Sequence, residues 1–110
     1  MTKNSAAIPE MVKEEALLAI ERFNYKTLRN TGYSFIARFR GKHLYLDRVE
    51  FGQTAPICRL QYMGAGKSWE FAIYKYSTAR YDPEETWFPG YEMVDGSVEG
   101  AMKAGMLAYG

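Results

Sequence analysis

Two β-rich runs that flank the link Gly64-Ala65-Gly66-Lys67 decide the architecture expected of this chain, and together they span Ala55–Tyr76. A short link that contains glycine, set between apolar-rich runs, indicates a β-hairpin. The turn gives a register in which Leu60 faces Phe71. Because a slip of one residue would move Phe71 to the face of Arg59, burial of one face should hold this register. The hairpin is therefore expected at the centre of an antiparallel sheet.

Two more turns extend this hairpin into a meander. Tyr33–Arg40 alternates between apolar and polar residues, and Gly41-Lys42 is a two-residue turn of the Gly-X type that sets Arg40 opposite His43. The next connection, Gly52-Gln53-Thr54, is expected to set three residues opposite three others: Leu44, Leu46 and Arg48 facing Tyr62, Leu60 and Cys58. Because the turns, chosen independently, bury the same face, the sequence predicts a four-stranded antiparallel meander.

Along the chain, one helix is predicted before these strands and one after them. Glu10–Lys26 carries an apolar stripe at helical spacing and follows Pro9, which lacks the N–H that would be unpaired in a first turn. Val98–Tyr109 follows two capping candidates, Asp95 and Ser97. The predicted fold class is α+β: an N-terminal helix, the four-stranded meander and a C-terminal helix, with both helices packed on one face of the sheet.

Length and charge bound the organisation of the chain. The 110 residues fit a single domain over 1–110, of which 1–8 are expected to be disordered. Residues 1–80 hold 13 Lys/Arg and 7 Asp/Glu, whereas residues 81–110 hold 1 and 6. Either the basic part binds an anionic partner, or the acidic segment folds over the basic sheet. The second reading is favoured because it needs no unseen ligand.

The cellular location is expected to be the cytoplasm. No apolar run has the length of a signal peptide or of a membrane span of about 20 residues, so no membrane partner is expected. The single cysteine, Cys58, cannot form an internal disulfide, which fits a reducing compartment.

The residues do not predict an enzyme, a cofactor site or a metal site. A zinc site needs three or four Cys or His ligands, and the chain has one of each. No nucleophile elbow, dinucleotide-binding or metalloprotease motif occurs. Asp82, Glu84 and Glu85 form an acidic cluster next to Pro83, a pattern that is more typical of a solvated turn than of paired catalytic carboxylates. No catalytic residue is therefore assigned.

The C-terminal half resembles a family of small uncharacterised bacterial proteins. The resemblance rests on WEFAIYKYS at 69–77, YDP at 81–83, FPG at 88–90 and DGSVEGAMKAGMLAY at 95–109. It implies a bacterial, cytoplasmic source. No activity accompanies this family, so the resemblance transfers no functional residues.

The outer face of the predicted sheet is the candidate binding surface, together with the aromatic loop that follows the last strand. Aromatic side chains interleaved with arginine are typical of proteins that bind single-stranded nucleic acids. Asp47 is expected opposite Arg59 and diagonal to Arg38, which would leave this face with little net charge. The candidate residues are Arg38, Arg40, Tyr45, Arg59, Tyr74, Tyr76 and Trp87.

An apolar end of the same face needs a cover. It is expected to hold Ile36, Val49, Ile57 and Tyr74. Its cover is the loop 81–93, a second copy of the chain or a partner protein, and packing of the loop rings Trp87 and Phe88 is the favoured outcome for that loop. The predicted function is a non-enzymatic interaction or binding module, with a homodimer as one form; the alternative is single-stranded nucleic-acid binding through the basic and aromatic sheet face.

Overall fold

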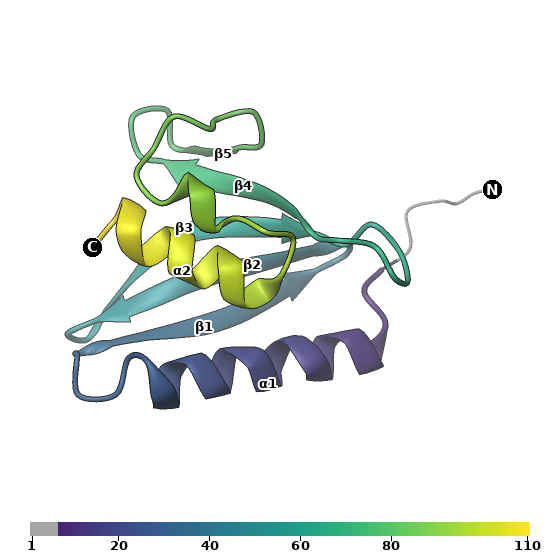
Figure 1. The fold of residues 1–110 in the computed structure, drawn as a ribbon, viewed down its shortest axis with the longest axis horizontal. Coiled ribbons are helices and arrows are strands. Elements are labelled where there is room, and N and C mark those ends of the chain that lie inside the picture. Colours follow the sequence, from purple (N-terminus) through teal and green to yellow (C-terminus); the bar gives the residue numbers. More distant parts are fainter. Residues whose placement is uncertain (1–6) are drawn as a thin grey trace.

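One antiparallel sheet and two helices make up the computed structural model, which describes residues 7–110. Its elements are α1 (Glu10–Lys26), β1 (Tyr33–Arg40), β2 (His43–Glu50), β3 (Gln53–Gln61), β4 (Glu70–Lys75), β5 (Arg80–Asp82), η1 (Tyr91–Met93) and α2 (Val98–Ala108). The strands pair in sequence order, β1-β2-β3-β4-β5 (Figure 1). The α+β class and the order of helix, antiparallel sheet and helix are confirmed, but the sheet has five strands and not four.

The fifth strand takes up the start of the segment 81–93, which the sequence predicts to be a loop. After β4 the chain turns at Ala79, which has a positive φ of 56°, and β5 then pairs with β4 so that Tyr74 lies opposite Tyr81. A strand of three residues is too short for a period of two to stand out in a sequence, and this is why β5 was missed.

Two of the three predicted hairpin registers are confirmed. Arg40 lies opposite His43 at the β1–β2 turn, and Leu60 lies opposite Phe71 in the central hairpin. Just beyond the strands of that hairpin, the rings of Tyr62 and Trp69 are 5.7 Å apart, so the side chains continue to meet across the turn.

The predicted β2–β3 register is wrong. Leu46 lies opposite Cys58 and not opposite Leu60, because the turn is the two-residue Phe51-Gly52 rather than a longer link. Both turn residues have positive φ, 52° and 88°, as a type I′ hairpin turn requires. The same turn sets Asp47 opposite Pro56, and a β-bulge between Leu46 and Asp47 then moves Leu46 from Ile57 to Cys58. The expected pairing of Asp47 with Arg59 does not occur.

The bulge also turns Ile57 to the inner face, together with Cys58. Both side chains are fully buried, and Ile57 lies against α2, where a Cβ added to Gly105 would come within 2.5 Å of the Ile57 Cγ2. The prediction that Ile57 belongs to an apolar patch on the outer face is therefore wrong, because an extra residue in one strand reverses the alternation after it.

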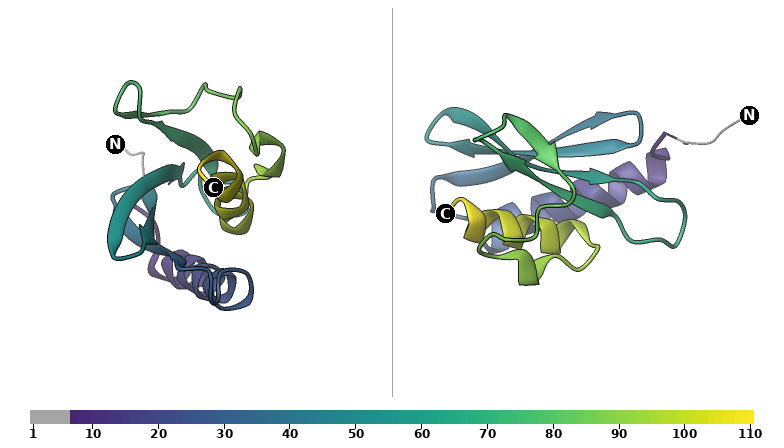
Figure 2. Two further views of the ribbon diagram at one scale, coloured as in Figure 1. Left: turned by 90° about the vertical axis from the view of Figure 1, so that its left-hand side faces the viewer. Right: turned by 90° about the horizontal axis from the view of Figure 1, so that it is seen from above.

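Both helices cover the inner face of the sheet and share one core with it. Figure 2 shows α1 and α2 against the same side of the curved sheet. The buried side chains come from the segment before α1, from both helices, from the loop after α1 and from the first three strands: Ile8, Ala16, Ile20, Phe23, Leu28, Phe35, Leu44, Leu46, Ile57, Cys58, Leu60, Val98, Ala101 and Met102.

The helix ends follow the sequence signals. α1 begins after Pro9, and the Ser97 side chain caps α2 by accepting a hydrogen bond from the Gly100 N–H at 2.9 Å.

Ile8 is buried, and its N–H donates to the Gly41 carbonyl at 3.2 Å, so this residue of the stretch 1–8 belongs to the core. The rest of the disorder prediction, over 1–6, lies outside the described residues. Neither helix of residues 7–110 combines the length and the apolarity needed to cross a bilayer.

Candidate functional site

A line of tyrosine rings runs across the outer face of the sheet. The ring of Tyr81 on β5 lies 5.2 Å from that of Tyr45 on β2 and 4.9 Å from that of Tyr74 on β4. Tyr76 extends the line, 4.9 Å from Tyr74. Contact between rings from strands that are not neighbours requires a strongly curved sheet, and Ala72 is buried on this face. Tyr81, the first residue of the segment 81–93, therefore covers the middle of the outer face, while Ile36 stays 40% exposed.

The ion pair on this face joins Arg38 to Asp47. Arg38 Nε donates to Asp47 Oδ2 at 2.6 Å, and its guanidinium lies 4.8 Å from the Tyr45 ring centroid. The diagonal contact between Arg38 and Asp47 was expected, whereas the one between Asp47 and Arg59 is absent. The hydrogen bond to Asp47 raises the pKa of Arg38 further above its ordinary value. Arg38 is thus neutralised by a buried carboxylate.

Tyr81 is held as a neutral phenol on this face. Its burial first, and the nearby Asp47 carboxylate second, raise the pKa of Tyr81 to about 12. A phenol with this pKa stays protonated at neutral pH, so Tyr81 is not set up as a general base or a nucleophile.

Positive charge gathers at one end of the outer face. Arg59 lies 5.5 Å from the Tyr81 ring centroid. Within residues 7–110, neither Arg40 nor Arg59 has a carboxylate within ion-pair distance. Burial lowers the pKa of His43, and the charges of Arg59 and Lys42 lower it further. This end keeps a cationic surface next to aromatic rings.

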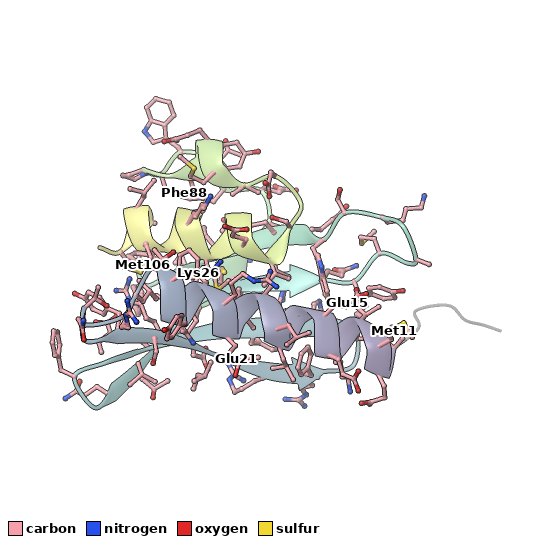
Figure 3. All side chains as sticks on the ribbon, turned by 60° about the horizontal axis from the view of Figure 1, so that its bottom comes forward. Met11, Glu15, Glu21, Lys26, Phe88 and Met106 are labelled. Atoms are coloured by element: carbon pink, nitrogen blue, oxygen red, sulfur yellow. The ribbon has the colours of Figure 1, made fainter. Side chains whose placement is uncertain are left out.

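Trp87 is not part of this face. Its side chain is 93% exposed, the highest value among the exposed large hydrophobic residues. Its neighbour Phe88 turns the other way and stacks on Phe71 of β4, with ring centroids 6.0 Å apart. Figure 3 shows Phe88 beyond α2, on the opposite side of that helix from α1. The expectation that both rings would pack holds for Phe88 and is wrong for Trp87.

Glu85 holds the loop that carries Trp87. Its carboxylate binds the Lys75 ammonium at 2.8 Å and accepts a hydrogen bond from the Trp87 N–H at 2.8 Å. The hydrogen bond to Lys75 first, and the one from the Trp87 backbone second, lower the pKa of Glu85. Asp82 lies 3.9 Å from the same ammonium. Within the acidic cluster, Asp82 and Glu85 therefore fix the loop, whereas the Glu84 carboxylate makes no ion pair within residues 7–110.

Two hollows flank Trp87. One, of about 480 Å³, is lined by Thr86, Trp87, Phe88, Pro89, Tyr91 and Glu92. The other, of about 300 Å³, is lined by Ile73, Lys75, Tyr76, Ser77, Glu85, Trp87, Phe88 and Tyr109. Trp87 is shared by both hollows and thus forms a ridge between two depressions, each with aromatic residues making up half of its lining.

Further exposed apolar side chains adjoin this ridge, and we call Trp87, Tyr91, Met93 and Leu107 together the Trp87 surface. Tyr91, Met93 and Leu107 are between 38% and 51% exposed. Gly90 seats the loop on α2, because a Cβ added there would lie 2.7 Å from the Leu107 Cβ. The loop and the outer side of α2 therefore present one apolar surface.

The seven candidate residues separate into two places. Five of them take part in the ring contacts of the outer face: Arg38, Tyr45, Arg59, Tyr74 and Tyr76. Arg40 lies at the cationic end of that face. Trp87 meets this group only at Tyr76, with which it lines a hollow. No sequence signal placed Tyr81 on the outer face, and Glu85 was marked only as part of an acidic cluster typical of a solvated turn. No group of three or more His, Cys, Asp or Glu in residues 7–110 is arranged to hold a metal ion.

Comparison with known proteins gives no family for this chain. No family model, no curated protein and no solved structure matches it. The resemblance to a family of small bacterial proteins stays a prediction.

Proposed function

We propose that this chain is a non-enzymatic binding module that contacts a partner protein through the Trp87 surface. The observation that carries the proposal is the 93% exposure of Trp87 on a loop that is otherwise anchored. Large exposed apolar patches on small proteins mark interaction sites, and tryptophan and tyrosine are enriched among the residues that dominate interface energies.

The loop is fixed before a partner arrives. Glu85 ties the backbone of Trp87 to Lys75 on β4, and Phe88 is stacked on Phe71. Because the loop backbone is already held, little of its conformational entropy remains to be lost on binding, and such preorganisation raises affinity. This feature supports a display role for Trp87.

A second copy of the chain is the less favoured occupant. In a symmetric dimer the same patch meets itself. Glu92 lines a hollow with Trp87, and Glu84 precedes Trp87 in the same loop; both glutamates are exposed. A symmetric dimer would bring two copies of each carboxylate into one interface, and like charges brought together there disfavour it. We therefore favour a different protein over a homodimer.

The test compares the chain with its Trp87→Ala variant as bait in extracts of the source cells. We expect at least one protein that the chain retains and Trp87→Ala loses, and that binds the purified chain directly. Tyr25→Ala is the matched control, because Tyr25 is also an exposed aromatic residue, 62% exposed on α1. Partners that depend equally on Tyr25 and Trp87, or on neither, would contradict the proposal. Solution mass at low micromolar concentration separates a homodimer from these outcomes.

Single-stranded nucleic-acid binding through the outer face is the second candidate. It is favoured by Arg40 and Arg59, which have no carboxylate within ion-pair distance in residues 7–110, and by the Tyr81 ring beside Arg59. Phosphate contacts make such binding salt-dependent. We expect the Arg40→Ala/Arg59→Ala variant to lose a shift seen with single-stranded oligonucleotides at low salt; absence of any shift with the unmodified chain ends this candidate.

A cytoplasmic, bacterial source belongs to the same proposal. The bacterial source rests on the resemblance alone, and the cytoplasmic location is supported by the single cysteine, Cys58, which is a fully buried core residue. Burial raises the pKa of its thiol well above the ordinary range, so Cys58 behaves as a small apolar side chain and not as a reactive group.

A further inference from the structure

We infer that the Trp87 surface takes an extended segment of a partner protein in which arginine or lysine adjoins apolar side chains. This inference rests on the proposed function and adds the chemistry of the ligand. It is argued from three features of the loop: the charge around Trp87, the two hollows beside it and the free face of its ring.

The charge of the loop selects a cationic partner. Asp82, Glu84, Glu85 and Glu92 lie within this loop or at its start. The adjoining β4–β5 hairpin supplies two cations, and of these Lys75 is already bound by Glu85 and Asp82. The carboxylates of Glu84 and Glu92 have no cation within ion-pair distance in residues 7–110. The surface therefore keeps negative charge for a ligand to neutralise.

The two hollows select an extended ligand. They lie on either side of Trp87 and share Trp87 and Phe88 as lining residues. A segment that crosses the Trp87 ridge can place one apolar side chain in each hollow. A helix presents its anchors along one stripe and suits a continuous groove better, whereas here a ridge interrupts the path.

Trp87 and Glu92 together select the cation. Glu92 lines the same hollow as the Trp87 ring. A guanidinium can stack on the indole face and donate to a nearby carboxylate at the same time, and tryptophan is the best aromatic partner for a cation. Anionic ligands, such as acidic peptides, nucleic acids and anionic lipid surfaces, would meet uncompensated carboxylates at this place.

The experiment is a selection from a random peptide display library on the full chain, with counter-selection on Trp87→Ala. We expect enriched peptides to carry arginine or lysine next to apolar residues. A synthetic copy of an enriched peptide should bind at least about tenfold more weakly to Glu92→Lys and to Glu84→Lys than to the unmodified chain, a factor that corresponds to the loss of one good charge contact. Glu70→Lys is the matched control, because Glu70 is an exposed carboxylate on β4, outside the loop.

A second readout reports the position of the bound peptide. In the Trp69→Phe background Trp87 is the remaining tryptophan, since the chain has two. Its emission should shift to the blue when a peptide covers the ring.

The outcomes separate the inference from the proposed function. Peptides that need Trp87 but are acidic, or that bind Glu84→Lys and Glu92→Lys as well as the unmodified chain, overturn the cationic ligand and leave the interaction role intact. Failure to enrich any Trp87-dependent peptide overturns the inference. If Trp87→Ala also retains every partner of the chain in extracts, the proposed function fails with it.

Discussion

The N–H of Trp87 donates to one carboxylate oxygen of Glu85, while the other oxygen of Glu85 binds Lys75 on β4. One side chain thus joins the most exposed aromatic residue to the sheet. The consequence is a tryptophan that is exposed without being loosely held.

Removing the Glu85 carboxylate should loosen Trp87. In the Trp69→Phe background we expect Glu85→Ala to lower the fluorescence anisotropy of Trp87, because the loop loses both its ion pair and its backbone acceptor. Glu84→Ala is the control, since the Glu84 carboxylate makes no hydrogen bond or ion pair within residues 7–110. Equal anisotropy in Glu85→Ala and the unmodified chain would show that the loop is held by other contacts.

Gly105→Ala should destabilise the fold by about 1–3 kcal/mol, the usual cost of overpacking a core. Alanine is normally favoured over glycine inside a helix by about 1 kcal/mol, so the sign of the stability change depends on what the new Cβ contacts. The added Cβ would lie 2.5 Å from the Ile57 Cγ2, and this clash makes the net change in stability unfavourable. Denaturant unfolding measures the change.

A double-mutant cycle tests the cause of this loss. The Gly105→Ala substitution should cost less in an Ile57→Ala background, where the space beside α2 is free. An unchanged cost there would mean that the loss arises elsewhere in α2.

Glu50→Ala should destabilise the chain by about 3 kcal/mol, because it leaves a buried cation without its partner. Arg48 is 3% exposed on the inner face, and its Nη2 donates to Glu50 Oε2 at 2.6 Å. The same guanidinium donates to the Tyr109 carbonyl and lies 4.6 Å from the Tyr33 ring centroid, which ties the end of α2 to the sheet. Urea unfolding checks the change, and addition of Arg48→Met should recover part of the loss; no recovery would contradict the ion-pair account.

Stability should fall as the pH drops from about 7.5 to 5.5, and His43 should cause the change. The pKa of His43 is lowered in the folded chain, by burial first and by the charges of Arg59 and Lys42 second. The unfolded chain therefore binds the proton more readily, so protonation favours unfolding once the pH falls below the ordinary histidine value of about 6.5. Glu85 and Asp95, whose pKa values are also lowered, act only near and below their ordinary values, at more acidic pH.

The control is His43→Gln, which should flatten the stability profile in this range because the chain has a single histidine. An NMR titration of the imidazole should give a midpoint below that of a free histidine side chain. A midpoint at or above it would contradict the burial account.

Much of the fold follows from local signals. The registers at the Gly41-Lys42 turn and in the central hairpin could be predicted, because a one-residue slip would bury polar residues. The β2–β3 register could not be read in the same way. Phe51, a residue that rarely adopts positive φ, forms half of the turn, and the bulge next to Asp47 changes the count beyond it. β5 was missed for a related reason: its pairing is set by the turn at Ala79 and by contacts of Tyr81 with distant strands.

The sequence predicted which residues lie on the candidate surface but not how their side chains contact one another. Alternation placed Tyr45, Arg59 and Tyr74 on one face, and the structure brings their neighbourhood together through Tyr81. Exposure of Trp87 could not be predicted, because it depends on whether a loop ring finds a place on the body of the protein. Phe88 finds one on Phe71, and Trp87 is turned outwards.

Photo-crosslinking from two positions tests most directly whether the Trp87 surface, rather than the outer sheet face, contacts the partner. A benzophenone amino acid is placed at position 87 in one variant and at position 40 in another, since Trp87 and Arg40 are both exposed. After irradiation in the source cells, we expect a discrete protein adduct from position 87 and no protein adduct from position 40. A protein or nucleic-acid adduct from position 40 alone would contradict the account.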